Sequence, residues 1–180
     1  MTWKNTAARY GSLSITLHWL MVLLLIAVYA CMECRDFYPK GSTGRAVIMQ
    51  SHFMLGLTVF VLVWLRLLAR SLGVTPRIMP PPPYWQLVLA TAMHGALYAL
   101  MIAMPLLGWL TLSGLARPIP FWGLELPALM VPNRDLGAQL EDWHIRIGDW
   151  GYWLIGLHAA AGIAHHYVRR DNALRRMLPP

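Results

Sequence analysis

The sequence predicts an all-α membrane protein, a bundle of four transmembrane helices with both termini in the cytoplasm. Three observations lead to this prediction: the composition, four long apolar stretches and the distribution of basic residues. Of the 180 residues, 57% are hydrophobic and 13% are charged, and the mean hydropathy is +0.47, whereas a soluble domain carries about 25% charged residues. No soluble module remains to bring the net charge of +7 onto a nucleic acid, so nucleic-acid binding is not expected.

Each apolar stretch is close to, or above, the roughly 20 residues that cross about 30 Å of hydrocarbon. The predicted spans are residues 12–32, 46–66, 85–108 and 141–168, within a single domain of residues 1–180. The first span is longer than the roughly 7–15 apolar residues of a signal peptide and contains His18, so we expect it to be retained. The third span is expected to begin after the proline run at residues 80–83, because proline disrupts a helix interior.

The connection between the third and fourth spans, residues 113–139, is expected to form an irregular cap on the outer surface. Its prolines argue against a regular helix, and Phe121, Trp122 and Leu129 suit the interface between membrane and water. At the outer end of the first span, Cys31 and Cys34 form a C-x-x-C pair. Such a pair can be a disulfide, half of a metal site or simple packing, and the sequence leaves these alternatives open.

Basic residues predict the orientation, because loops rich in Lys and Arg stay in the cytoplasm. The side that holds both termini carries nine of them: Lys4, Arg9, Arg66, Arg70, Arg77, Arg169, Arg170, Arg175 and Arg176. The other side carries six: Arg35, Lys40, Arg45, Arg117, Arg134 and Arg146. Both termini are therefore predicted to be cytoplasmic.

Histidine is the residue type that most needs an explanation. The seven histidines are His18, His52, His94, His144, His158, His165 and His166. The first five lie deeper within the predicted spans than His165 and His166, which are at the inner end of the fourth, and an ionisable group there is costly and marks a function. His144 and His158 are 14 residues apart, which places them on one helix face and about 21 Å apart along its axis. That is too far for two ligands of one metal ion, and it fits two redox centres, one near each membrane surface.

Each centre then needs a second imidazole at a matching depth on another span. His52, near the outer end of the second span, matches His144. His158 has two possible partners, His18 and His94, and depth alone does not choose between them. Two imidazoles on opposite sides of an iron hold a haem for electron transfer and leave no open position at the metal.

Glycines add support to this interpretation. Gly56, Gly148 and Gly162 each follow one of these histidines by four residues, on the same helix face and one turn further along. A residue without a side chain lets a flat porphyrin approach the backbone. Each glycine alone could be an ordinary close-packing position of a membrane helix, but three such coincidences favour haem.

Three parts of the chain resemble the bacterial cytochrome b561 family: "LSITLHWLMVLLLIAVYACMECRDFYPK", the isolated His52, and "WHIRIGDWGYWLIGLHAAAGIAHHYVRRDNALRRM". That family consists of four-helix dihaem membrane proteins, related to the cytochrome b subunits of hydrogenases and formate dehydrogenases. The resemblance implies a bacterial inner-membrane protein with two haem b groups. It implies His18 with His158 as ligands of the inner haem and His52 with His144 as ligands of the outer haem. His94 would then be free for another role.

The resemblance also implies electron exchange with ubiquinone beside one haem. A quinone carbonyl needs a hydrogen-bond donor that can deliver a proton, and His94 and His165 are the candidates at the depth of the inner haem. The candidate partners of the haem propionates are Arg9, Arg70 and Arg169 on the inner side and Lys40, Arg45, Arg134 and Arg146 on the outer side.

One activity described in the family is the oxidation of superoxide on the periplasmic side, with delivery of the electron to ubiquinone. Such a small anion would be attracted by the basic residues of the outer side, namely Lys40, Arg45, Arg117 and Arg134. We therefore expect a superoxide:ubiquinone oxidoreductase, with superoxide or another small one-electron reactant as the periplasmic partner.

Other functions stay open at this point. One alternative comes from the related families. The protein would then be an electron-transfer anchor of a larger dehydrogenase or hydrogenase and would have a redox partner protein. A proton-coupled transporter would also use intramembrane histidines, but intramembrane carboxylates are missing. A di-iron hydroxylase needs clusters of closely spaced histidines, and only His165 and His166 are adjacent.

Overall fold

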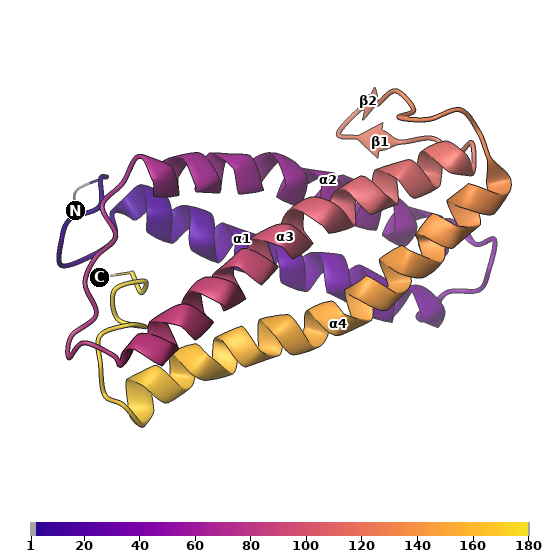
Figure 1. Cartoon of the computed structure of the whole chain (residues 1–180). Coiled ribbons are helices and arrows are strands. Elements are labelled where there is room, and N and C mark those ends of the chain that lie inside the picture. The colour runs from indigo at the N-terminus through magenta and orange to yellow at the C-terminus, as the bar shows by residue number, and fades with distance from the viewer. Residues whose placement is uncertain (1–2, 180) are drawn as a thin grey trace.

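The computed structural model describes residues 3–179 and consists mainly of four long helices (Figure 1). They are α1 (Ser12–Cys34), α2 (Thr43–Ser71), α3 (Tyr84–Gly114) and α4 (Arg134–Tyr167). A single 3-10 turn, η1 (Arg35–Phe37), follows α1. Two short antiparallel strands, β1 (Pro120–Phe121) and β2 (Leu124–Glu125), lie between α3 and α4. The predicted all-helical fold is confirmed.

Helix α4 begins earlier than the sequence suggested, so the expected irregular connection of residues 113–139 is shorter. Asn133 caps the helix, because its side-chain oxygen accepts a hydrogen bond of 3.0 Å from the Leu136 N–H. Gly137 in the first turn packs directly on Gly114 at the end of α3, where a Cβ atom on either residue would lie 3.0 Å or less from the other's backbone. The prolines of the connection therefore end before this cap and do not disturb α4.

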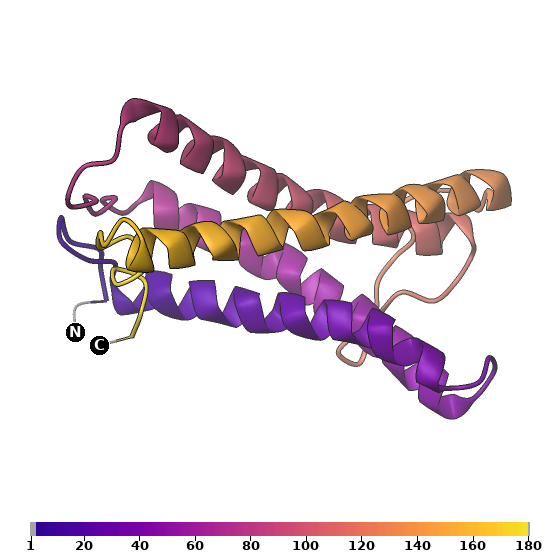
Figure 2. The ribbon, with the colours of Figure 1, turned by 90° about the horizontal axis from the view of Figure 1, so that it is seen from below.

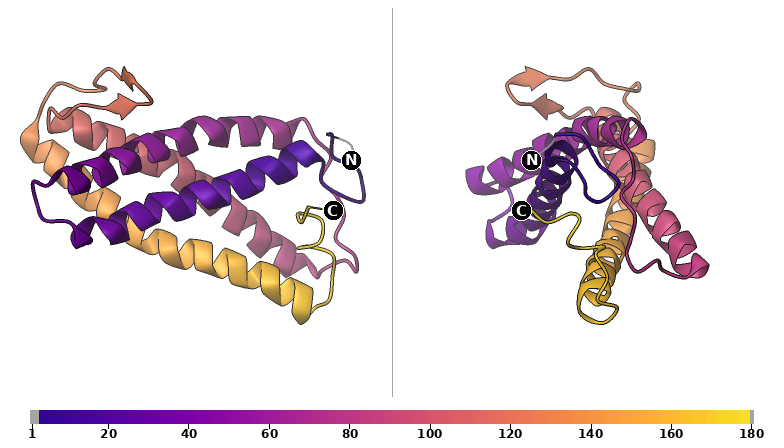
Figure 3. Two further views of the ribbon diagram at one scale, coloured as in Figure 1. Left: turned by 180° about the vertical axis from the view of Figure 1, so that it is seen from behind. Right: turned by 90° about the vertical axis from the view of Figure 1, so that its left-hand side faces the viewer.

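The four helices form two antiparallel pairs, α1 with α2 and α3 with α4, and the pairs cross each other (Figure 1 and Figure 3, left). Helices α2 and α3 touch at the crossing, where Met21, Val59, Val63 and Met101 form a buried apolar core. In the described part of the chain, α1 and α4 nowhere bring their Cα atoms within 8 Å of each other. Figure 2 shows the two pairs diverging. Side chains thus bridge the space between α1 and α4, and backbones do not.

Both chain ends lie together at one end of the bundle, which we call the terminal end (Figures 1 and 3). The β1–β2 hairpin lies at the opposite end, the hairpin end (Figure 1). Within residues 3–179, three helices are long and apolar enough to cross a membrane: α1 with η1 (Ser12–Phe37), α2 and α3. Helix α4 has 34 residues, and six charged residues in its first half together with four histidines make it more polar than the others.

The connection between α3 and α4 is held by side-chain hydrogen bonds rather than by regular structure. Trp122 donates from Nε1 to the Thr58 hydroxyl of α2 over 2.9 Å, and Trp109 donates to the Pro127 carbonyl, also over 2.9 Å. Trp122 and Gly123 form the hairpin turn with φ of 47° and 88°, values typical of a two-residue type I′ turn. The connection therefore forms a cap against α2 and α3.

Candidate metal centres between the helices

The first histidine pair lies toward the hairpin end. The rings of His52 on α2 and His144 on α4 have centres 6.1 Å apart and planes inclined by 80°. The Nδ1 atom of His52 lies 3.1 Å from the Val28 carbonyl oxygen of α1. Because a carbonyl oxygen only accepts hydrogen bonds, Nδ1 carries the proton and Nε2 keeps a free lone pair. His52 is therefore fixed in the tautomer that binds a metal through Nε2.

The second group of histidines lies toward the terminal end and has three members. His158 on α4 stands between His18 on α1, at 6.4 Å between ring centres and 79° between planes, and His94 on α3, at 5.4 Å and 70°. The Nδ1 atom of His18 is buried and has no hydrogen-bond partner in the described residues. The structure thus brings together every intramembrane histidine that the sequence singled out.

The ring separations distinguish the possible pairs. A metal–imidazole bond is about 2 Å long and the ring centre lies roughly 1.2 Å beyond the bonding nitrogen, so two imidazoles on opposite sides of one ion would have centres roughly 6.4 Å apart. The His52–His144 and His18–His158 separations of 6.1 and 6.4 Å fit this value. The His94–His158 separation of 5.4 Å is too short. Depth left His18 and His94 as alternatives, and the separation of His18 from His158 lies nearer this value.

The two pairs lie at different levels of the bundle. Val28, the hydrogen-bond partner of His52, follows His18 by ten residues on α1, which corresponds to about 15 Å along the helix axis. The apolar core of Met21, Val59, Val63 and Met101 lies between these two levels. No group of three or more His, Cys, Asp or Glu side chains that could hold a metal ion occurs in the described residues. The arrangement is one of separate pairs, without a multinuclear cluster.

A cavity surrounds the hairpin-end pair. Its empty volume, with its mouth included, is about 1110 Å³, and its walls include both histidines as well as Gly56 and Gly148. A Cβ atom on Gly56 would meet nothing within 4 Å, and one on Gly148 would meet only the Met104 methyl group, at 3.4 Å. The glycines one turn after the histidines thus leave room beside them, as a flat ring requires. Gly162, one turn after His158, also faces open space.

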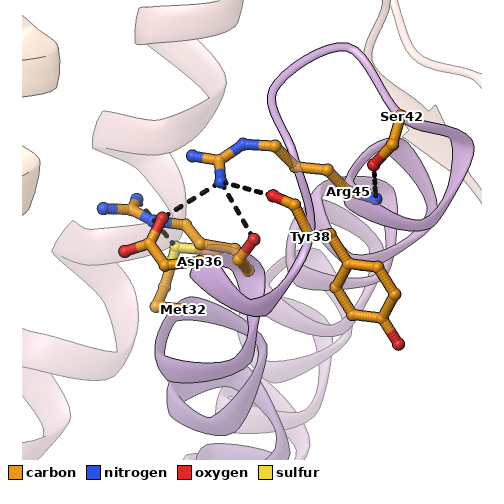
Figure 4. A network of polar contacts seen from close by, with 6 residues as sticks. Met32, Asp36, Tyr38, Ser42 and Arg45 are labelled. Carbon is orange, nitrogen blue, oxygen red and sulfur yellow. Dashed lines mark hydrogen bonds and ion pairs between the residues drawn. The ribbon is translucent and has the colours of Figure 1, made fainter.

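Acidic residues dominate the charge around this cavity. Glu33, Asp36 and Asp149 line it together with a single basic residue, Arg35. Arg45, one of the expected outer cations, is bound to Asp36 over 3.0 Å and donates to two carbonyl oxygens of the α1–α2 turn, 2.9 and 3.3 Å away (Figure 4). Arg45 is therefore engaged in holding this turn and does not offer a free positive charge.

Two tyrosines bridge the space between α1 and α4 beside the cavity. Tyr29 on α1 donates a hydrogen bond of 3.0 Å to the Gly148 carbonyl, and Tyr152 on α4 donates one of 2.5 Å to Glu33. Their ring centres are 4.4 Å apart. A Cβ atom on Gly151 would overlap the Tyr29 hydroxyl. We call these contacts the tyrosine brace, because they connect helices whose backbones stay apart.

The terminal-end histidines have basic neighbours. Arg66 and Arg70 on α2 both lie over the ring of Tyr98, with the guanidinium carbon 5.9 and 5.8 Å from the ring centre. Arg66 acts electrostatically on His18, His94 and His158. Arg70 was expected as a partner of a haem propionate, and Arg66 lies over the same tyrosine ring.

Four further residues that the sequence singled out lie outside the two histidine groups. Arg9 donates to the Leu178 carbonyl over 2.5 Å, in the tail that follows α4. His165 lies 2.6 Å from a carboxylate oxygen of Asp171, beyond the end of α4. Cys31 and Cys34 are free thiols.

Three residues that contact the histidines or line their surroundings were not predicted from the sequence. Arg66 was counted only as a loop charge, although its spacing of four residues from Arg70 predicts a shared helix face. Tyr29 gave no signal, because only the fold brings it to Gly151. Asp171 lies six residues after His165 and reaches it only because the chain turns at the end of α4.

Two level-separated histidine pairs within a bundle of apolar helices define a class, the membrane cytochromes b. Residues 9–180 match the model of one family in this class, the prokaryotic cytochrome b561 family. The chain belongs to this family, so it is a multi-pass membrane protein with four transmembrane helices and haem b as its cofactor.

Individual relatives align over nearly the whole chain. Cytochrome b561 homolog 1 of Escherichia coli K12 is 36% identical over 171 residues, which cover 95% of this chain and 97% of that protein. The probable superoxide oxidase CybB of Yersinia pestis is 35% identical over 171 residues, covering 95% and 96%. Cytochrome b562 of Cereibacter sphaeroides is 28% identical over 176 residues, covering 95% and 96%.

Proposed function

We propose that the protein is a dihaem cytochrome that carries electrons across the bacterial inner membrane, from a one-electron donor at the hairpin end to ubiquinone at the terminal end. The hairpin end would face the periplasm and both chain ends the cytoplasm, in accord with the excess of basic residues at the terminal end. The observation that carries the proposal is the pair of histidine separations, 6.1 and 6.4 Å, at two levels of one bundle.

His52 and His144 would hold one haem b, and His18 and His158 the other. A haem held by these residues would supply reversible one-electron chemistry. The Val28 carbonyl orients His52 for this role, and Gly56 and Gly148 leave space for the ring. Reactants must therefore approach the edge of the haem and cannot bind iron directly.

His94 is the proposed contact for ubiquinone at the terminal end. Its ring adjoins His158 at 5.4 Å, so a quinone that it holds would lie next to the haem bound by His158. The ring can donate a hydrogen bond to a quinone carbonyl. His165, two turns after His158 on the same helix, is the second candidate and lies nearer the chain end.

Superoxide is the proposed donor, and its support comes from the name of the Yersinia pestis relative, a probable superoxide oxidase at 35% identity. The electrostatic attraction that the sequence suggested receives no support. The hairpin end carries six basic residues against seven acidic ones, which are Glu33, Asp36, Glu125, Asp135, Glu141, Asp142 and Asp149. Arg45 is also neutralised by Asp36. Superoxide would thus reach the cavity by diffusion, against a small repulsion.

A haem determination on histidine variants tests the proposal. The pyridine haemochrome assay should find two haem b groups per chain in the wild type and one in each of His18→Ala, His52→Ala, His144→Ala and His158→Ala. His52→Ala and His144→Ala should leave the same residual spectrum, and His18→Ala and His158→Ala the other. His166→Ala, outside both pairs, is the control and should keep both haems. A loss of haem in His94→Ala with retention in His18→Ala would overturn the terminal-end pairing.

The donor and acceptor are tested in the same preparations. Rapid mixing with superoxide should reduce the wild-type haems, and a short-chain ubiquinone should reoxidise them. No reduction by superoxide would leave the donor role to a redox partner protein or a dehydrogenase subunit, which would then co-purify with the chain. No reoxidation by ubiquinone would exclude the proposed acceptor.

A further inference from the structure

The tail that follows α4, residues 168–179, folds back into the space between α1 and α4 at the terminal end (Figure 1 and Figure 3, left). Trp19, next to His18, donates from Nε1 to the Met177 carbonyl over 2.8 Å. The Asn172 side chain accepts from the Met79 N–H over 2.9 Å, in the α2–α3 loop. Arg9, before α1, donates to the Leu178 carbonyl, so hydrogen bonds to three parts of the fold fix the tail.

One result of this docking is a buried carboxylate. Asp171 is 4% exposed, and both of its oxygens have partners. Oδ1 accepts from the Ala173 N–H over 2.9 Å, and Oδ2 lies 2.6 Å from Nδ1 of His165. The Asp171 N–H also donates to the His165 carbonyl over 3.1 Å, so the two residues are held at two points.

Positive charges surround this carboxylate. Burial by itself raises the pKa of Asp171, but the Ala173 N–H, the His165 ring and Arg169 together bring the pKa below its ordinary value. Arg176, whose own pKa is lowered by burial, also acts electrostatically on Asp171 and stands over the ring of Tyr10. Asp171 is therefore ionised at neutral pH and accepts the Nδ1–H of His165.

This partner determines what His165 can do. With Nδ1–H bound to a carboxylate, Nε2 is the ring atom left to exchange a proton with a bound reactant. The side chain of His165 is 24% exposed. It follows His158 by seven residues, about 20° around α4 and about 10 Å along its axis, on the side of the chain end. His165 thus lies between the terminal-end histidines and the water at that end.

We propose that His165 and Asp171 form a proton-transfer dyad that serves the quinone at the terminal end, with His165 as the proton donor and Asp171 as its positioning residue. The proposal rests on the proposed function. Two superoxide ions give up one electron each and leave as two molecules of dioxygen. One quinone takes up the two electrons and two protons and becomes a quinol. His165 delivers a proton from Nε2 and regains it from cytoplasmic water, while Asp171 stays ionised.

The experiment follows reoxidation of the dithionite-reduced, haem-loaded full chain by a short-chain ubiquinone between pH 6 and 8.5. Asp171→Asn keeps a hydrogen-bond acceptor for Nδ1 but removes the charge, so the rate should fall about tenfold at pH 8 and less at pH 6. His165→Gln should lose about a hundredfold, the lower range of general acid catalysis. Asn172→Ala, which loosens the same tail without touching the dyad, should keep the wild-type pH profile.

Two readouts separate a proton-transfer role from a structural one. Ferricyanide takes electrons without protons, so all variants should reduce it at the wild-type rate, with both haems retained. If Asp171→Asn keeps the wild-type pH profile with quinone, or slows ferricyanide equally, the dyad is overturned. If the wild type itself fails to react with quinone, ubiquinone is not the acceptor and the dyad has no substrate. This result is distinct from a failure of the dyad alone, in which the wild type reacts and the variants behave like it.

Discussion

The two histidine pairs have nearly the same geometry, 6.4 Å and 79° at the terminal end and 6.1 Å and 80° at the hairpin end. Their surroundings differ in charge. Arg66 and Arg70 adjoin the terminal-end histidines, whereas Glu33, Asp36 and Asp149, with one arginine among them, line the hairpin-end cavity. A nearby positive charge favours the reduced form of a redox centre and a negative charge the oxidised form. We therefore expect identical ligands to give two potentials, with the higher one at the terminal end.

The two ends also differ in how the gap between α1 and α4 is bridged. At the hairpin end the tyrosine brace connects the helices beside the cavity. At the terminal end the tail occupies the gap and brings Asp171 to His165. Under the proposed function, proton exchange would belong to the terminal end, where a quinone needs it, and the hairpin end would serve a donor that brings no proton.

The largest expected effect is the loss of one haem from a single glycine substitution. In Gly56→Leu a side chain would enter the cavity beside His52, so the haemochrome assay should find about one haem per chain, with the terminal-end spectrum retained. Gly156→Leu is the matched control, because Gly156 also faces open space but does not line the cavity. Two haems in Gly56→Leu would place the hairpin-end haem away from this glycine.

The tyrosine brace should respond to a smaller change. In Gly151→Ala the new methyl group overlaps the Tyr29 hydroxyl, and such overpacking costs about 1–3 kcal/mol. We expect the thermal unfolding midpoint to fall by about 5 °C. Adding Tyr29→Phe removes the overlapping hydroxyl, so the double variant should recover part of the loss. A double variant less stable than Gly151→Ala would show that the hydroxyl and the methyl group do not compete.

Charge removal sharpens the electrostatic side of the comparison. Arg66→Gln takes one positive charge from beside the terminal-end histidines, and we expect the potential of that haem to fall by about 50 mV, which corresponds to a Coulomb term of about 1 kcal/mol. The hairpin-end potential should hardly move. Arg175→Gln, in the exposed part of the tail, is the control, and an equal shift there would point to a general surface effect.

The smallest expected effect concerns the approach of superoxide. Asp149→Asn removes a negative charge from the cavity wall, so the rate of haem reduction by superoxide should rise about twofold at low salt. The gain should shrink at high salt, where the screening length falls from about 10 Å at 0.1 M to about 3 Å at 1 M. Asp142→Asn, on the same helix but outside the cavity, should change the rate less. A slower reaction in Asp149→Asn would mean that the carboxylate assists the donor.

The fold and the histidine pairs could be predicted because they depend on local pattern. Apolar length predicts the spans, and a spacing of 14 residues predicts one helix face. The choice between His18 and His94 could not be made from the residues, since both lie at a similar depth and only the helix packing sets their distances to His158. The resemblance to a family supplied that choice, which stays a prediction; the ring separations to His158 are 6.4 Å for His18 and 5.4 Å for His94.

Charge pairing was the least predictable part of the site. The ion pair between Arg45 and Asp36 depends on the turn between α1 and α2, so Arg45 was expected to act as a free cation. The Asp171–His165 contact depends on the path of the tail after Tyr167. The early start of α4 had a local signal, the capping Asn133, but the neighbouring prolines outweighed it.

A potentiometric titration of two single-haem variants tests the central claim most directly. His52→Ala should retain only the terminal-end haem and His18→Ala only the hairpin-end haem, so each should titrate as a single one-electron centre. We predict that the haem remaining in His52→Ala has the higher potential, by several tens of millivolts, because Arg66 and Arg70 adjoin it. Equal potentials, a reversed order or two centres in either variant would contradict the account.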